Sequence, residues 1–139
     1  MSEAQNPRRT GHSIVALLAG FVVVVALSLA TDMALHATGV LPPLGQPMSD
    51  TLAGIALAYR TIYGVVGSYI VARLAPYRPM SHAVLSGFVG LVLSIVGAAA
   101  TWNKGPAFGP HWYPLALIAT TLPGAWVGGK LHSLLYRRA

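Results

Sequence analysis

Hydrophobic residues form four long runs along this chain of 139 residues. The runs cover about 13–35, 50–74, 80–102 and 112–136, and short segments rich in glycine, proline or polar residues separate them. Each run reaches the ~20 residues that an α-helix needs to cross ~30 Å of hydrocarbon. The pattern predicts an all-α membrane protein with four transmembrane helices.

The connections between the runs are short, which favours two antiparallel helical hairpins in tandem. We expect the first hairpin at about 13–75 and the second at about 79–137, within one membrane domain that covers 13–139. Residues 1–12 are expected to form a polar cytoplasmic tail.

The two predicted hairpins resemble each other in sequence. Residues 16–22 align with 83–89 with five identities in seven positions, and residues 67–74 align with 124–131 by residue character. This favours an internal duplication, with the two halves related by a pseudo-two-fold axis along the membrane normal. A chance alignment of helices rich in alanine, glycine and valine is the alternative.

Composition and charge support a membrane protein and predict its orientation. Only 9% of the residues are charged, whereas a soluble domain carries about 25%. Basic residues gather at both ends of the chain and between the second and third runs: Arg8, Arg9, Arg73, Arg78, Lys130, Arg137 and Arg138. This is the positive-inside pattern, so both termini should be cytoplasmic. The net charge of +6 then reflects orientation and contact with the anionic lipid bilayer, and we expect no nucleic-acid binding.

The sequence offers little for catalysis or for cofactor binding. It has no cysteine, which excludes disulfides and thiolate metal sites. It has no HExxH motif, no phosphate-binding loop and only three acidic residues. We therefore expect neither an enzyme nor a cofactor, with an intramembrane enzyme built on Asp32 and His36 as the alternative.

Arg60 lies near the middle of the second run, where a charge costs at least ~2.5 kcal/mol and normally has a partner. It shares a helix face with small residues spaced three or four apart: Ala53, Ala56, Gly64 and Gly67. On the first run, Asp32 shares a stripe with Ser28 and His36. Asp32 lies in the outer part of the first helix, and the second helix begins on the same outer side. Helical side chains lean toward the N-terminus of their helix, so the guanidinium of Arg60 is carried toward Asp32. We predict a salt bridge between Asp32 and Arg60.

Two interpretations of this pair compete. In the structural one, the pair joins the first hairpin and compensates each buried charge. In the functional one, Arg60 binds an anion or Asp32 takes up a proton, and the pair opens during transport. The second half does not repeat the charges, because Arg60 aligns with Leu117 and Asp32 aligns with Ala99. This asymmetry adds weight to the functional interpretation.

Three further polar residues are candidates for an accessory role: Ser28, His36 and His111. Asp32, His36 and His111 together could provide oxygen and nitrogen ligands for a metal. The alternative is that the two histidines lie at the membrane interface with their rings partly in water, and on this basis we expect no metal site.

Small residues mark the expected helix contacts, because they let backbones approach closely in a membrane. The packing positions are Gly64, Ser68, Ser86, Gly90, Ser94, Gly124 and Gly128. We expect these residues to pack within the four-helix bundle, and Gly124-x-x-x-Gly128 could also form the face of a homodimer. Trp102, Trp112 and Tyr113 are expected to form an interfacial aromatic belt.

One segment of this sequence, in the second run and the connection that follows it, resembles a segment of other proteins. Residues 60–64, 67–76 and 78–83 are Arg-Thr-Ile-Tyr-Gly, Gly-Ser-Tyr-Ile-Val-Ala-Arg-Leu-Ala-Pro and Arg-Pro-Met-Ser-His-Ala. This segment resembles one found in small uncharacterised bacterial membrane proteins. The resemblance implies a four-span protein of the bacterial inner membrane and carries no established activity with it.

The predicted function is that of a structural or accessory helical bundle in the membrane, with a homodimer or a larger membrane protein as partner. The alternative is a small oligomeric transporter or channel for an ion or small anion that uses Asp32 and Arg60. We place the transporter second, because a single four-helix bundle of small residues is expected to enclose little space.

Overall fold

The computed structural model describes residues 7–137, and its regular secondary structure in this range is entirely helical. The helices are α1 (Pro7–Ala37), α2 (Asp50–Leu74), α3 (Pro79–Thr101) and α4 (Trp112–Arg137), and a short 3₁₀ helix, η1 (Pro106–Phe108), precedes α4. The predicted all-α class is confirmed.

The start of α1 differs from the prediction. Residues 7–12 belong to the helix, although the sequence suggests a polar tail over 1–12. Proline suits the first turn of a helix, where its missing N–H would have no intrahelical partner, so Pro7 can open α1. Residues 1–6 lie outside the described residues.

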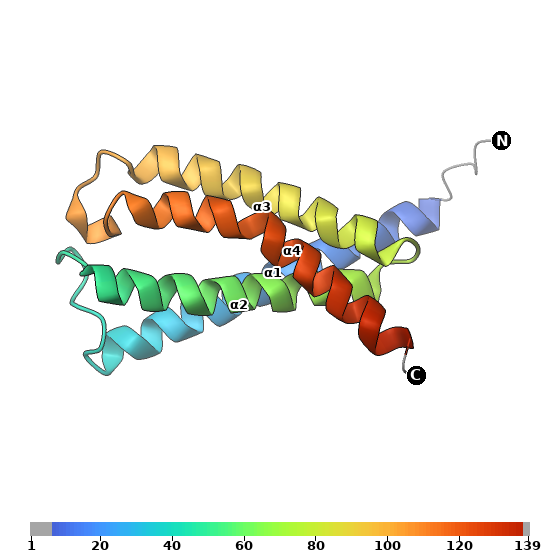
Figure 1. Cartoon of the computed structure of the whole chain (residues 1–139), viewed down its shortest axis with the longest axis horizontal. Helices are drawn as coiled ribbons and strands as arrows, with labels where there is room; N and C mark the ends of the chain where they lie inside the picture. Colours follow the sequence, from blue (N-terminus) through green and yellow to red (C-terminus); the bar gives the residue numbers. More distant parts are fainter. Residues whose placement is uncertain (1–6, 138–139) are drawn as a thin grey trace.

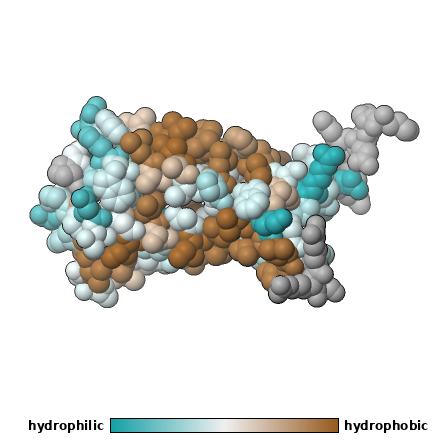
Figure 2. Space-filling view, viewed as in Figure 1, coloured by the Kyte–Doolittle hydropathy of each residue, from teal (hydrophilic) through white to brown (hydrophobic). Residues whose placement is uncertain are grey.

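Three helices, α1, α2 and α3, are long and apolar enough to cross a membrane. On the face shown in Figure 2, apolar side chains cover much of the middle, and hydrophilic ones lie mainly toward the two ends. α4 has a similar length, but Thr120, Thr121, Pro123 and Lys130 lower its apolar character. The fourth span and the orientation in the membrane therefore stay predictions.

Local sequence accounts for the helix ends that position the bundle. Ser49 is the N-cap of α2, and its Oγ accepts a hydrogen bond from the Leu52 N–H at 3.3 Å. Arg78 adopts a left-handed conformation with φ of 43°, and Pro79 then opens α3. Consecutive helices run antiparallel, so the start of α1 and the end of α4 lie at one end of the bundle (Figure 1). We call the opposite end, with the α1–α2 and α3–α4 connections, the two-loop end.

The two hairpins meet mainly through their second helices (Figure 1). α2 packs against both α1 and α4, and α4 also packs against α3. α1 and α3 contact each other much less. The bundle is therefore closed by α2 and α4 on one side and only loosely closed between α1 and α3.

Each hairpin has a close contact between a glycine on its first helix and its second helix. A Cβ at Gly20 would lie 2.7 Å from the carbonyl oxygen of Gly67, and a Cβ at Gly87 would lie 2.5 Å from the Cβ of Ala125. Gly20 aligns with Gly87 in the two halves, and Gly67 aligns with Gly124, the neighbour of Ala125. Each hairpin thus places a glycine of its first helix close to its second helix, although the partner is Gly67 in one hairpin and Ala125 in the other.

The two glycines of Gly124-x-x-x-Gly128 pack inside the chain. A Cβ at Gly128 would lie 2.5 Å from the carbonyl oxygen of Val65 and 2.7 Å from the Cβ of Ser68, which shows how closely α4 approaches α2. A Cβ at Gly124 would meet the Val65 side chain at 3.7 Å, an ordinary contact. Both glycines are buried, so a homodimer would need another face of the bundle.

The other predicted packing positions differ in their contacts. The hydroxyl oxygens of Ser68 and Ser86 lie 3.4 Å apart and join α2 to α3. A Cβ at Gly90 would lie 3.1 Å from the Thr121 methyl group. Gly64 is the exception, because a Cβ there would meet no atom within 4 Å. The helix contact expected at Gly64 is therefore absent.

Candidate functional site

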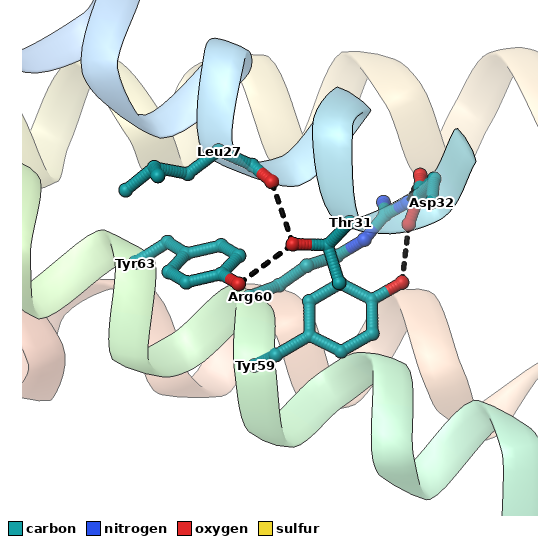
Figure 3. A network of polar contacts seen from close by, with 6 residues as sticks. All are labelled: Leu27, Thr31, Asp32, Tyr59, Arg60 and Tyr63. Atoms are coloured by element: carbon teal, nitrogen blue, oxygen red, sulfur yellow. Dashed lines mark hydrogen bonds and ion pairs between the residues drawn. The ribbon is translucent and has the colours of Figure 1, made fainter. Parts of the chain in front are cut away.

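The structure brings Asp32 on α1 and Arg60 on α2 together as an ion pair (Figure 3). Arg60 Nη2 donates to Asp32 Oδ2 at 2.5 Å, and the hydroxyl of Tyr59 donates to Asp32 Oδ1. Each oxygen of the carboxylate therefore has a donor from α2. Two successive residues of one helix provide both donors, which holds the carboxylate between them.

A second polar contact involves Thr31, the residue before Asp32 on α1. Thr31 Oγ1 donates to the carbonyl oxygen of Leu27 at 2.8 Å and lies 2.6 Å from the hydroxyl of Tyr63 (Figure 3). Because the threonine hydroxyl has one proton and gives it to Leu27, Tyr63 donates to Thr31. The rings of Tyr59 and Tyr63 are 5.8 Å apart. These contacts extend the connection between α1 and α2 beyond the ion pair.

The guanidinium of Arg60 is only partly used by this network. It carries five N–H donors, and one of them bonds to Asp32. Arg60 Nε is buried and has no hydrogen-bond partner among the described residues. The side chain of Arg60 is nevertheless 35% exposed, and that of Asp32 is 22% exposed. Arg60 therefore combines an unsatisfied buried donor with access to space around it.

That space consists of two cavities that adjoin at Arg60. The polar cavity, of about 320 Å³, lies toward the two-loop end and includes Asp32, His36, Tyr59 and Tyr113 in its lining. The apolar cavity, of about 440 Å³, extends toward the other end and is lined from all four helices. Three residues line both cavities: Arg60, Ser94 and Leu117.

Tyr113 differs from the aromatic belt that the sequence suggests. It is only 9% exposed and packs against Ala53 and Ala56, so it belongs to the interior at the two-loop end. Trp102 and Trp112 are 38% and 39% exposed, as belt residues would be. Tyr113 thus forms part of the wall that surrounds Arg60.

The three accessory residues do not gather at one point. Ser28 lines the apolar cavity and His36 lines the polar one, where the Nδ1 of His36 donates to the carbonyl oxygen of Pro42 at 2.9 Å. His111 is exposed and lines neither cavity, because its ring stacks on Trp102 with ring centres 4.2 Å apart. Within residues 7–137 no three histidine, aspartate or glutamate residues are placed to hold a metal, so the metal alternative has no support.

Sequence reasoning missed the tyrosines that surround the pair. Tyr59 precedes Arg60, and Tyr63 follows Tyr59 by one helical turn, so both lie beside the arginine on α2. Their hydroxyl groups need partners in an apolar setting, which was an available signal for contacts with Thr31 and Asp32. The burial of Tyr113 depends on how α4 packs on α2, and no local pattern indicates it.

Comparison of the chain with protein-family models, with curated proteins and with solved structures finds no match. Its function is therefore inferred from the geometry of the site around Arg60.

Proposed function

We propose that this chain is an integral membrane protein that binds a small anion at Arg60 and transports it. The observation that carries the proposal is the position of Arg60 between two cavities, with a partly exposed guanidinium that has N–H donors beyond the one bonded to Asp32. A guanidinium offers a planar set of donors that matches carboxylate and phosphate groups. Surroundings of low dielectric strengthen such a contact relative to water.

Asp32 supplies the second half of the mechanism. In the empty site its carboxylate neutralises Arg60, so the charge of this residue is compensated. An incoming anion competes with Asp32 for the guanidinium, and a proton on Asp32 would keep the occupied site neutral. The proposed transport therefore couples anion binding at Arg60 to proton uptake at Asp32.

The volumes of the two cavities favour a transporter more than the sequence alone does. Ligand sites in proteins commonly have volumes of about 300–1,000 Å³. The cavities of about 320 and 440 Å³ lie within a single chain, so a site of this size does not require a dimer. With the orientation that the basic residues suggest, the polar cavity would lie on the outer side of the bacterial inner membrane and both termini in the cytoplasm.

The test is anion-dependent thermal stability followed by flux. Acetate and inorganic phosphate are titrated into the purified protein in a neutral detergent, for the wild type, Arg60→Gln and the control Arg73→Gln. Arg73 is exposed at the far end of α2, so its loss should leave anion stabilisation unchanged. We expect at least one anion to raise the Tm of the wild type and of the control, but not of Arg60→Gln. Wild type that shows neither stabilisation nor flux in liposomes would refute the proposal.

A structural or accessory role is the second candidate, and one observation favours it. Both oxygens of Asp32 are already bonded to α2, so the network is complete as a connection between α1 and α2. A protein of this kind would purify as a homodimer, or together with another membrane protein in fixed stoichiometry, and would show no flux in liposomes. Arg60→Gln would then lower stability without any effect of anions.

A further inference from the structure

The apolar cavity opens on the outside of the bundle between α1 and α3. Phe21 and Val25 on α1, and Val89 and Leu93 on α3, line the cavity and are themselves exposed. α1 and α3 make few contacts with each other, which leaves this side without a covering helix. In a membrane the outside at this depth is hydrocarbon, so the cavity is accessible laterally from the bilayer.

The dimensions of the cavity suit a single hydrocarbon chain. On α2 its lining extends from Arg60 to Val71, which corresponds to about 16 Å at 1.5 Å per residue. Its volume of about 440 Å³ lies within the range of about 300–1,000 Å³ that is common for sites of small ligands. An extended alkyl chain can therefore lie along this lining.

One end of this apolar cavity is charged. Arg60 lies at its border with the polar cavity, and its partly exposed guanidinium has N–H donors that Asp32 does not use, as an anionic group needs. Around the same point Tyr59 and Tyr113 line the polar cavity. The polar cavity and the apolar cavity thus lie on either side of one guanidinium. An anionic amphiphile would fill this arrangement.

Gly64 keeps the apolar cavity open directly beside Arg60. It follows Arg60 by one helical turn, lines the apolar cavity, and a Cβ there would meet no atom within 4 Å. A Cβ at this position would therefore extend into the apolar cavity without touching a neighbouring helix. The close approach of another helix does not require glycine here, and the missing side chain leaves room for a ligand.

We infer that the anion bound at Arg60 is the carboxylate or phosphate headgroup of a single-chain amphiphile, taken laterally from the bilayer between α1 and α3. The headgroup lies at the guanidinium and the tail lies in the apolar cavity along Gly64. This inference rests on the proposed anion binding at Arg60 and adds the substrate class to it.

The experiment compares ligands that differ only in their tail or only in their charge. Acetate, octanoate, hexadecanoate and uncharged hexadecanol are titrated into the protein in neutral detergent, with Tm and direct binding as readouts. The variants are Arg60→Gln, Gly64→Leu and the control Gly54→Leu. Gly54 is a fair control, because a Cβ there also meets no atom within 4 Å and the residue lines neither cavity.

We expect wild type to bind hexadecanoate at least tenfold more tightly than acetate, with octanoate between them. Gly64→Leu should weaken the binding of hexadecanoate at least tenfold and leave the binding of acetate unchanged, whereas Gly54→Leu should bind both as wild type does. Arg60→Gln should weaken the binding of both acetate and hexadecanoate. As a second measurement, hexadecanoate with a photoreactive group near the tail end should crosslink to α1 and α3 in the wild type, at positions beside the apolar cavity.

Two outcomes separate this inference from the function on which it rests. Equal binding of hexadecanoate by Gly64→Leu and Gly54→Leu, or crosslinks spread evenly around the bundle, would overturn the inference that the ligand is an amphiphile. If acetate still bound in a manner that depends on Arg60, the proposed anion site would stand. Hexadecanol bound as tightly as hexadecanoate, with no effect of Arg60→Gln on any ligand, would overturn both.

Discussion

Arg60 and Leu117 occupy corresponding positions in the two hairpins, and both line the two cavities that adjoin inside the bundle. The offset of 57 residues that aligns 67–74 with 124–131 also aligns these two residues. In both hairpins a glycine of the first helix lies close to the second helix, but the charge is not repeated. Of the two aligned positions, one therefore carries a charge and the other an apolar side chain.

This relationship predicts the behaviour of a variant that gives the first hairpin the residues of the second. Asp32→Ala combined with Arg60→Leu copies Ala99 and Leu117 and removes both charges at once. Replacing an ion pair with apolar residues is often neutral or stabilising, whereas removing one partner leaves a charge uncompensated. We expect the free energy of unfolding of the double variant to equal or exceed that of wild type, or to fall below it by no more than about 1 kcal/mol. Each single variant should lower the free energy of unfolding by about 1–3 kcal/mol.

Equilibrium unfolding in detergent measures these differences, and acetate binding is the second readout. The double variant should fold and yet bind no acetate. A double variant that loses as much stability as the two single variants together would show that Asp32 and Arg60 do not interact energetically, against their contact in the structure.

Tyr59 and Tyr63, the tyrosines of α2 that bond to α1, should differ in their effect on stability. Tyr59→Phe removes one of the two donors to Asp32, and we expect a loss of about 1–2 kcal/mol because a carboxylate oxygen loses its partner. Tyr63→Phe leaves Thr31 still bonded to Leu27, so the loss should stay near 0.5 kcal/mol. Thermal unfolding of the two variants side by side checks this order, and the reverse order would contradict the network in Figure 3.

Gly124 and Gly128 on α4 offer a matched pair for the packing of α4 on α2. Gly128→Ala places a Cβ 2.5 Å from the carbonyl oxygen of Val65, so the helices must separate and we expect a loss of about 1–3 kcal/mol. Gly124→Ala makes an ordinary contact at 3.7 Å and should be neutral or stabilise by up to about 1 kcal/mol, because alanine favours a helix. Equal losses at both positions would be inconsistent with this interface.

Ser13 and His82 connect α1 to α3 on the side where the two helices otherwise barely touch. His82 is buried, and its Nε2 lies 2.9 Å from Ser13 Oγ. Ser13→Ala removes the hydrogen-bond partner of His82 Nε2 on α1, so we expect faster hydrogen exchange in the first turns of α1 and α3. Ser81→Ala changes an exposed serine and serves as the control. Unchanged exchange in Ser13→Ala would show that the contact does not hold the two helices.

Much of the architecture follows from local sequence because helices of a membrane protein are specified by length and apolar character. The four helices lie close to the four runs, and the main difference is the earlier start of α1 at Pro7. The partnership of Asp32 and Arg60 also follows from sequence, since helical spacing gives each charge a face and direction. Its role as an anion site stays a prediction.

Other features depend on how each helix is rotated and tilted against its neighbours. Gly64 and Gly128 are both small residues in a small-residue stripe, yet Gly64 faces a cavity and Gly128 touches the backbone of α2. Tyr113 belongs to an aromatic group at a helix start, but it is buried. No periodic pattern distinguishes these cases.

The sequence by itself determined the helical class and the partnership of Asp32 and Arg60, and it predicted four spans, of which three are long and apolar enough to cross a membrane. Only the tertiary structure decided that Arg60 lies between two cavities and that one cavity opens on the outside of the bundle between α1 and α3. The physical reason is that hydrogen bonding and hydropathy act along a single helix, whereas cavities arise from the contacts that several helices make or fail to make together.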